Sequence, residues 1–208
     1  MESSAPPRAP GGRRNGRQAR NGQELRAYAR DRLIESRLTP NAISMVGLFG
    51  NLVAAALVTQ RLFFLAGVAF ILGSVMDTLD GRYSRMSGKG TPFGAFLDST
   101  TDRIGEGLML GAIALLAARD ARLLTVGLAF FGMLGSLLVS YTRARAEALG
   151  LKGAVGIGSR AERVVVITAG LVLAPWGVLP YALGLLCVTA WVTVGQRVWS
   201  VRQQLRQS

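Results

Sequence analysis

Long apolar stretches constrain this chain more than any other feature of its sequence. Six of them follow one another after residue 40, separated by short polar loops, and half of the 208 residues are hydrophobic. A stretch of about 20 apolar residues is long enough to cross a bilayer as a helix. The sequence therefore predicts an all-α, polytopic membrane protein with six transmembrane helices. The predicted spans cover approximately residues 42–59, 62–80, 93–118, 122–142, 161–175 and 178–199.

The lysines and arginines predict how these spans are oriented. With a cytoplasmic N-terminus, the cytoplasmic side carries 20 of the 24 basic residues, nine of them before residue 40. The opposite side carries only Arg61, Arg119 and Arg122, and Arg103 lies within a predicted span. Because basic loops stay in the cytoplasm, we expect a multi-pass protein of the cell membrane with both termini cytoplasmic. The net charge of +12 is thus explained by basic segments on the cytoplasmic side of the bilayer, and we expect no nucleic-acid partner.

Four segments are expected along the chain. Residues 1–21 lack any apolar run and form a predicted disordered, basic arm. Residues 22–38 predict an amphipathic juxtamembrane helix that lies in the headgroup region, although a solvated helix leading into the first span fits the same pattern. Residues 39–200 form the predicted six-helix domain, and residues 201–208 form a basic tail.

Four aspartates, Asp77, Asp80, Asp98 and Asp102, lie within the second and third apolar stretches. Each ionised carboxylate at membrane depth costs about 2.5–3.5 kcal/mol on insertion scales. Spacings of three and four residues put each pair on one face of its helix, and the two helices are joined by a short loop. The four carboxylates can therefore converge near the cytoplasmic face.

Converging carboxylates favour a metal site. The chain has no histidine and only one cysteine, Cys187, so oxygen ligands suited to Mg²⁺ or Mn²⁺ remain. We expect two ions per site, which together could hold a diphosphate. Two alternatives stay open: ion pairs with Arg82, Arg85 or Arg103, and the cation path of a cation-coupled transporter.

The aspartates belong to a longer pattern, Asp77-x2-Asp80-Gly81-x2-Ser84-Arg85-x8-Gly94-x3-Asp98-x3-Asp102. This pattern resembles the motif of the CDP-alcohol phosphotransferase family of integral membrane enzymes. Every charged position and every glycine fits, and Ser84 stands where the family usually has alanine. The resemblance implies that residues 39–200 form a six-helix CDP-alcohol phosphotransferase domain.

The same resemblance implies a reaction in phospholipid biosynthesis. A hydroxyl of an alcohol would attack the β-phosphorus of CDP-diacylglycerol, and CMP would leave. The four aspartates would bind the metal ions, and Asp102 would also act as the catalytic general base. The residues implied to bind the CDP donor are Asn41, Gly81, Ser84, Arg85 and Gly94.

A second basic loop predicts the kind of acceptor. Arg143, Arg145, Arg160 and Arg163 flank the loop between the fourth and fifth spans, and guanidinium groups favour a phosphorylated alcohol. The loop is similar to that of phosphatidylinositol-phosphate synthases of actinobacterial type, which implies inositol phosphate as acceptor. Glycerol-3-phosphate, giving phosphatidylglycerophosphate, is the alternative. Ordinary positive-inside charge with Arg–Glu pairs would explain the same arginines without a ligand.

A small-residue stripe, Gly107-x3-Gly111, follows the last aspartate. Such stripes allow two membrane helices to pack closely. The stripe therefore predicts either a homodimer contact or a close contact within the helix bundle.

Overall fold

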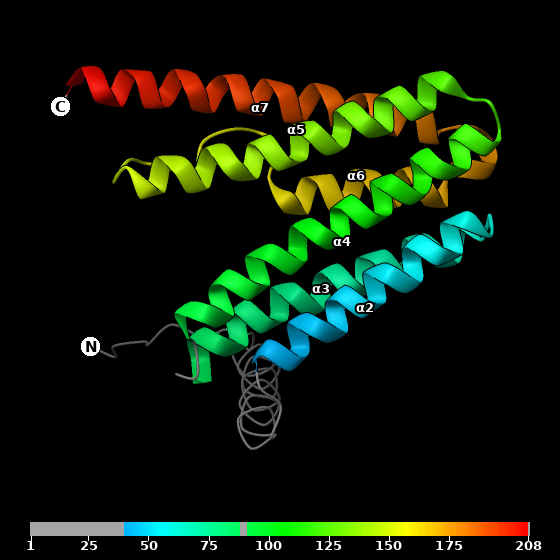
Figure 1. Ribbon diagram of the computed structural model, residues 1–208, viewed down its shortest axis with the longest axis horizontal. Helices are drawn as coiled ribbons and strands as arrows, with labels where there is room; N and C mark the ends of the chain where they lie inside the picture. Colours follow the sequence, from blue (N-terminus) through cyan, green and yellow to red (C-terminus); the bar gives the residue numbers. More distant parts are fainter. Residues whose placement is uncertain (1–39, 88–90, 208) are drawn as a thin grey trace, which may run out of the picture. The chain divides into compact units, whose positions relative to one another are not determined.

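The computed structural model describes residues 40–87 and 91–207, without the side chains of residues 40, 41, 43 and 76–87. The predicted arm (1–21) and amphipathic helix (22–38) lie outside these residues. The described residues form six α-helices and one short 3-10 turn at residues 174–176 (Figure 1). The helices are α2 (Pro40–Thr59), α3 (Phe63–Ser87), α4 (Pro92–Arg119), α5 (Leu123–Ala148), α6 (Arg160–Val172) and α7 (Leu179–Gln207).

Each of the six predicted apolar stretches is confirmed as a helix. Three helices run past the apolar residues that predicted them: α3 continues to Ser87, α5 to Ala148 and α7 to Gln207, through the basic tail. A helix does not end where its apolar residues end, because its backbone hydrogen bonds are made within the helix itself. The extensions carry polar and basic residues at one end of the bundle.

By length and composition, two of the described helices, α5 and α7, could each cross a membrane. Shorter apolar segments, Ser44–Thr59 and Phe63–Val75, lie in α2 and α3. Helix α4 has 28 residues but carries four charged side chains between Asp98 and Glu106, and α6 has only 13 residues. The all-α class is thus confirmed, and six spans stay a prediction.

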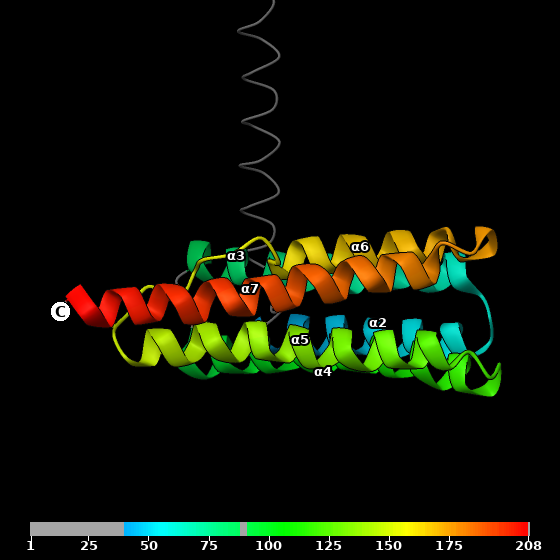
Figure 2. The ribbon, with the colours of Figure 1, turned by 90° about the horizontal axis from the view of Figure 1, so that it is seen from above.

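The helices pack in two layers of three helices each. Figure 2 shows α2, α4 and α5 on one side and α3, α6 and α7 on the other. Helix α2 packs on α3 and α4, α5 packs on α4 and α7, and α6 packs on α3 and α7. Side chains from all six helices fill the core between the layers. The largest fully buried apolar ones are Phe70, Met109, Leu110, Ile113, Ile167, Leu171, Leu183, Leu186 and Val58.

A buried amide fixes the first part of α4. Asn51 of α2 is 1 % exposed and lies between Gly73 of α3 and Gly105 of α4. A Cβ at Gly73 would be 2.7 Å from Asn51 Oδ1, and a Cβ at Gly105 would overlap the Asn51 amide. The two glycines therefore allow three helices to close around one side chain. This contact lies one turn beyond Asp102 and holds that part of α4 in place.

The Gly107 and Gly111 stripe has a different setting. A Cβ at either position would meet no atom within 4 Å. The stripe faces an apolar groove between α2 and α4, lined also by Leu52, Ala55 and Leu115. Among the described residues, the two glycines are not used for close packing inside the bundle, and a homodimer through this stripe stays a prediction.

Candidate functional site

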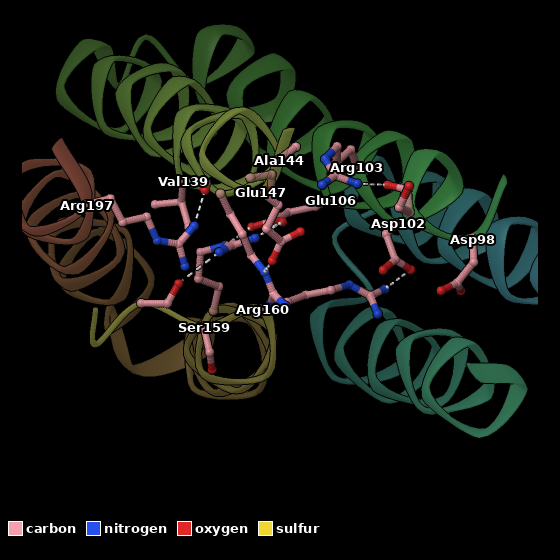
Figure 3. A pocket seen from close by; sticks show the side chains of 15 residues that line it. Asp98, Asp102, Arg103, Glu106, Val139, Ala144, Glu147, Ser159, Arg160 and Arg197 are labelled. Atoms are coloured by element: carbon pink, nitrogen blue, oxygen red, sulfur yellow. Dashed lines mark hydrogen bonds and ion pairs between the residues drawn. The ribbon is translucent and has the colours of Figure 1, made fainter. Parts of the chain in front are cut away.

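A pocket opens among α4, α5, the start of α6 and α7, and charged side chains from all four helices line it. Its volume is about 470 Å³. Among the described residues, five arginines and four carboxylates line it. Figure 3 shows Asp98 and Asp102 at one end of the pocket and Arg197 at the other. The charged lining residues are Asp98, Asp102, Arg103, Glu106, Arg143, Glu147, Arg160, Arg163 and Arg197.

The acidic end is built on the first turns of α4. Thr91 caps this helix by accepting a hydrogen bond from Gly94 N at 3.0 Å, and Pro92 occupies its first turn. Asp98, Asp102 and Glu106 then follow at intervals of four residues and share one face of the helix. All three line the pocket. Asp98 and Asp102 therefore share one face of α4, as their spacing predicts, while the convergence of all four aspartates stays a prediction.

The second pair of aspartates lies in α3. The backbone of Asp77 and Asp80 belongs to this helix, a neighbour of α4, but their side chains lie outside the described ones. The side chains of Ser84 and Arg85, like Gly81, lie in the part of α3 outside the described side chains, and that of Asn41 lies in the corresponding part of α2. Among the described side chains, no group of three or more His, Cys, Asp or Glu residues could hold a metal ion. The four-aspartate site stays a prediction, with its α4 half described.

The start of α6 brings two arginines to the pocket. Ser159 forms a capping box with Glu162: the Ser159 hydroxyl accepts from Glu162 N at 3.4 Å, and the Glu162 carboxylate accepts from Ser159 N at 2.6 Å. The cap fixes where α6 begins, and hence where Arg160 points. Arg160 Nη2 lies 2.7 Å from Asp102 Oδ1 (Figure 3). This is an ion pair between two predicted site residues.

Arg163 is held by a buried ion pair. Its Nε and Nη2 donate to the two carboxylate oxygens of Glu106 at 2.7 and 2.9 Å, and its Nη1 donates to Gly158 O at 3.0 Å. Arg163 is 3 % exposed and Glu106 is 6 % exposed. Both charges are desolvated, and each compensates the other. Arg163 therefore joins α6 to α4 along the wall of the pocket.

Of the two predicted site arginines in α5, only one lines the pocket. Arg143 lines the pocket, where its Nε donates to Glu147 at 2.8 Å. The structure does not bring Arg145 to this pocket; it lies beside Tyr141 and Leu149 in a groove facing α7. Residues two apart on a helix point in nearly opposite directions, so a run of basic residues cannot all serve one cavity.

Arg197 of α7 is a pocket residue that the sequence did not reveal. Its side chain is 7 % exposed, donates from Nε to Val155 O at 2.8 Å and also donates to Val139 O. In the sequence it looks like another positive-inside residue after an apolar run. Its position follows only from the path of the loop between α5 and α6.

Known proteins are similar to this chain in sequence. The model of the CDP-alcohol phosphatidyltransferase family matches residues 37–199. The archaetidylinositol phosphate synthase of Pyrococcus horikoshii is 33% identical over 169 residues, covering 81% of this chain and 86% of its own. The phosphatidylinositol phosphate synthase of Mycobacterium marinum is 36% identical over 179 residues, covering 81% of this chain and 76% of its own.

Solved structures agree with these relatives. The phosphatidylinositol phosphate synthase of Mycobacterium tuberculosis with CDP-DAG bound gives a TM-score of 0.75 at 30% identity, covering 83% of this chain and 91% of that one. The same enzyme with manganese and citrate gives a TM-score of 0.76 at 31% identity, covering 83% and 87%. This chain is an enzyme of the CDP-alcohol phosphatidyltransferase family.

Proposed function

We propose that this enzyme transfers a phosphatidyl group from CDP-diacylglycerol to inositol phosphate and releases CMP, as a phosphatidylinositol-phosphate synthase. The single observation that carries the proposal is the pocket with two ends: aspartates on α4 at one end and arginines at the other. A diphosphate donor needs its charge neutralised, and a phosphomonoester acceptor needs cationic partners. One cavity offers both.

The donor end would hold the divalent metal. Asp98 and Asp102 fit such an ion because they present carboxylate oxygens from one helix face into the pocket. With Asp77 and Asp80 of α3 they would hold two ions, Mg²⁺ or Mn²⁺, and a manganese-bound structure of a relative supports the choice of metal. Bound there, the metal would neutralise the diphosphate and the departing CMP. The residues proposed to bind CDP are Asn41, Gly81, Ser84, Arg85 and Gly94.

Asp102 would take the proton from the acceptor. It stands between Asp98 and Arg160, so a hydroxyl of an alcohol bound by the arginines would be close to its carboxylate. Proton removal makes the oxygen a stronger nucleophile toward the β-phosphorus of the donor. The new phosphorus–oxygen bond forms as the bond to CMP breaks.

The acceptor end would bind the phosphate of inositol phosphate. Arg160 is about a quarter exposed, and an incoming phosphate would compete with Asp102 for its guanidinium. Arg143 and Arg197 line the same end, while Arg163 stays paired with Glu106 and shapes the wall. The names of the relatives favour inositol phosphate over glycerol-3-phosphate as the acceptor, since these relatives are named as synthases of inositol-phosphate lipids.

The bundle would sit in the cell membrane with six spans and with the pocket toward the cytoplasm. Large apolar side chains on its outside support this, among them Phe64 at 62 % and Leu124 at 75 % exposure. Soluble proteins rarely present such surfaces without a partner. Arg61, Arg119 and Arg122 lie at the end away from the pocket, where the positive-inside rule expects few basic residues.

An acceptor panel tests the proposal. Purified protein with CDP-diacylglycerol and Mg²⁺ is given inositol phosphate, glycerol-3-phosphate, inositol or serine, and CMP release is measured with the lipid product. We expect CMP and phosphatidylinositol phosphate in equal amounts with inositol phosphate. Preference for glycerol-3-phosphate would assign the alternative product, and release only with unphosphorylated alcohols would overturn the role of the arginines.

A further inference from the structure

The loop between α5 and α6, residues 149–159, is attached along α7 by side chains of that helix; we call it the strap. It has no regular secondary structure. Near its start, the Gln204 amide accepts from Lys152 N at 2.9 Å and donates to Lys152 O at 3.1 Å. In its middle, Arg197 Nε donates to Val155 O at 2.8 Å. Both ends of a strap segment are thus tied to one helix.

The last tie is made by a fully buried threonine. Thr193 Oγ1 accepts from Gly158 N at 2.8 Å and donates to Thr189 O at 2.7 Å, and Thr193 is 0 % exposed. Positions 193, 197 and 204 fall near one face of α7. The strap therefore follows a continuous row of polar side chains along this helix.

Glycines let the strap approach Thr193 closely. Gly156 has a φ of 115°, which L side chains rarely adopt, and a Cβ there would overlap the Thr193 methyl group. A Cβ at Gly158 would lie 2.8 Å from Thr193 Oγ1. The hydroxyl and the two glycines form one tight contact, so the strap has little freedom at this point.

This contact leads directly to the pocket. The N–H of Gly158 binds Thr193, and its carbonyl accepts from Arg163. The next residue is Ser159, which caps α6 and is followed by Arg160. A connected set of hydrogen bonds therefore runs from α7 through the strap to the arginines at the start of α6.

We propose that Thr193 is a positioning residue for the acceptor end of the pocket: by binding Gly158 it fixes the cap of α6 and thereby the place of Arg160. Thr193 itself does not line the pocket. The inference rests on the proposed function in one respect, namely that the arginines receive the acceptor phosphate. Loss of the hydroxyl would leave the buried N–H of Gly158 without its acceptor, which is unfavourable. The strap would then shift, and the cap of α6 and Arg160 would shift with it.

The test uses three substitutions in the purified full chain. Thr193→Val removes the hydroxyl and keeps the shape, Thr193→Ser keeps the hydroxyl, and Thr189→Val is the matched control one turn earlier. The Thr189 hydroxyl donates to the carbonyls of Leu185 and Leu186 in its own helix. We expect Thr193→Val to raise the acceptor KM about tenfold and the CDP-diacylglycerol KM less than about twofold. Thr193→Ser and Thr189→Val should stay near the original enzyme.

A calorimetric measurement of inorganic phosphate binding, made without the CDP donor, tests the role of Thr193 without requiring turnover. Thr193→Val should weaken phosphate binding about tenfold while Thr193→Ser does not. An original enzyme that binds phosphate but turns over no phosphorylated acceptor would refute the proposed function and leave the strap tested by binding alone. Equal effects on both KM values, or unchanged phosphate affinity in Thr193→Val, would overturn the positioning role.

A second variant covers the case in which Thr193→Val does not fold. Gln204→Ala removes both bonds to Lys152 at the exposed start of the strap, and Gln203→Ala is its exposed neighbour. We expect the acceptor KM to rise about twofold to threefold in Gln204→Ala, which corresponds to about half of a hydrogen bond's usual contribution. The acceptor KM of Gln203→Ala should stay unchanged. Identical acceptor KM values in these two variants would overturn the idea that the strap positions the pocket.

Discussion

Arginine–carboxylate pairs occur at both ends of the helix bundle, but they differ in burial and in what surrounds them. At the pocket end, Arg163 binds Glu106 through two hydrogen bonds, and both side chains are buried. At the far end, Arg61 reaches from the α2–α3 turn to Asp120 in the α4–α5 turn, also through two hydrogen bonds. The Arg61 side chain is 57% exposed.

The comparison shows that geometry alone does not decide what a pair contributes. An exposed pair gains little, since water and salt screen both charges. A buried pair adds little net stability when intact, yet removing one partner leaves an uncompensated charge in a low-dielectric interior. Asp102 and Arg160 lie at the pocket end. A substitution that removes a charge there should therefore affect the proposed binding site as well as stability.

Asp102→Asn should produce the largest effect on activity. The substitution keeps the shape but removes the proposed base and one metal ligand, so we expect turnover to fall by about 10³-fold or more. Binding of the CDP donor, measured separately, should weaken much less. Turnover within twofold of the original enzyme would show that Asp102 is not the base.

Glu106→Ala should produce the largest effect on stability. It leaves Arg163 buried without its partner, at a cost of about 3–5 kcal/mol in the free energy of unfolding. Thermal unfolding in detergent measures this loss. Glu147→Ala is the control, because its pair with Arg143 is half-exposed and should contribute about 0.3–0.5 kcal/mol. Similar losses in the two variants would contradict the role of burial.

Asp120→Asn should have a small effect on both stability and activity. Its pair with Arg61 joins two turns at the end of the bundle away from the pocket, and it is open to solvent. We expect thermal unfolding close to that of the original protein and unchanged kcat and KM. A loss comparable with that of Glu106→Ala would remove the distinction between the two ends.

The pair between Arg61 and Asp120 should make the stability of the protein depend on pH. The hydrogen bond from Arg61 holds the pKa of Asp120 below its usual value, against the opposing effect of burial. The folded pKa is therefore lower than the unfolded one, about 3.9, and the pair contributes fully above that pH. Its contribution is lost as the pH falls through the folded pKa.

The stability difference between the original protein and Asp120→Asn measures this contribution. We expect it to be constant from about pH 8 to pH 5 and to shrink only in more acidic solution. A difference that changed between pH 6 and pH 8 would contradict the assignment.

The sequence predicted the helices well because each apolar stretch determines its own local structure. It also placed Asp98 and Asp102 on one face, since spacing along a helix is a local property. It could not separate Arg143 from Arg145 without knowing which side of α5 faces the cavity. The start of α6 carries a local signal that our sequence analysis did not use, because Ser159 and Glu162 have the spacing of a capping box.

The strap and Arg197 were beyond sequence reasoning for a physical reason. Arg197 and Thr193 contact residues about 40 positions earlier in the chain. Such contacts depend on how helices pack, and an arginine after an apolar run has the same appearance whether it points to solvent or into a pocket. Only the packing of α7 against the strap shows which occurs.

Whether Arg160 recognises the acceptor phosphate is tested most directly by comparing inositol phosphate with inositol in the original enzyme and in Arg160→Gln. The quantity measured is the ratio of the two kcat/KM values, with CDP-diacylglycerol and Mg²⁺ held constant. We predict that the ratio falls by about 10-fold to 100-fold in the variant, while the donor KM changes by less than about twofold. An unchanged ratio would contradict a pocket that binds the donor at its aspartates and the acceptor at its arginines.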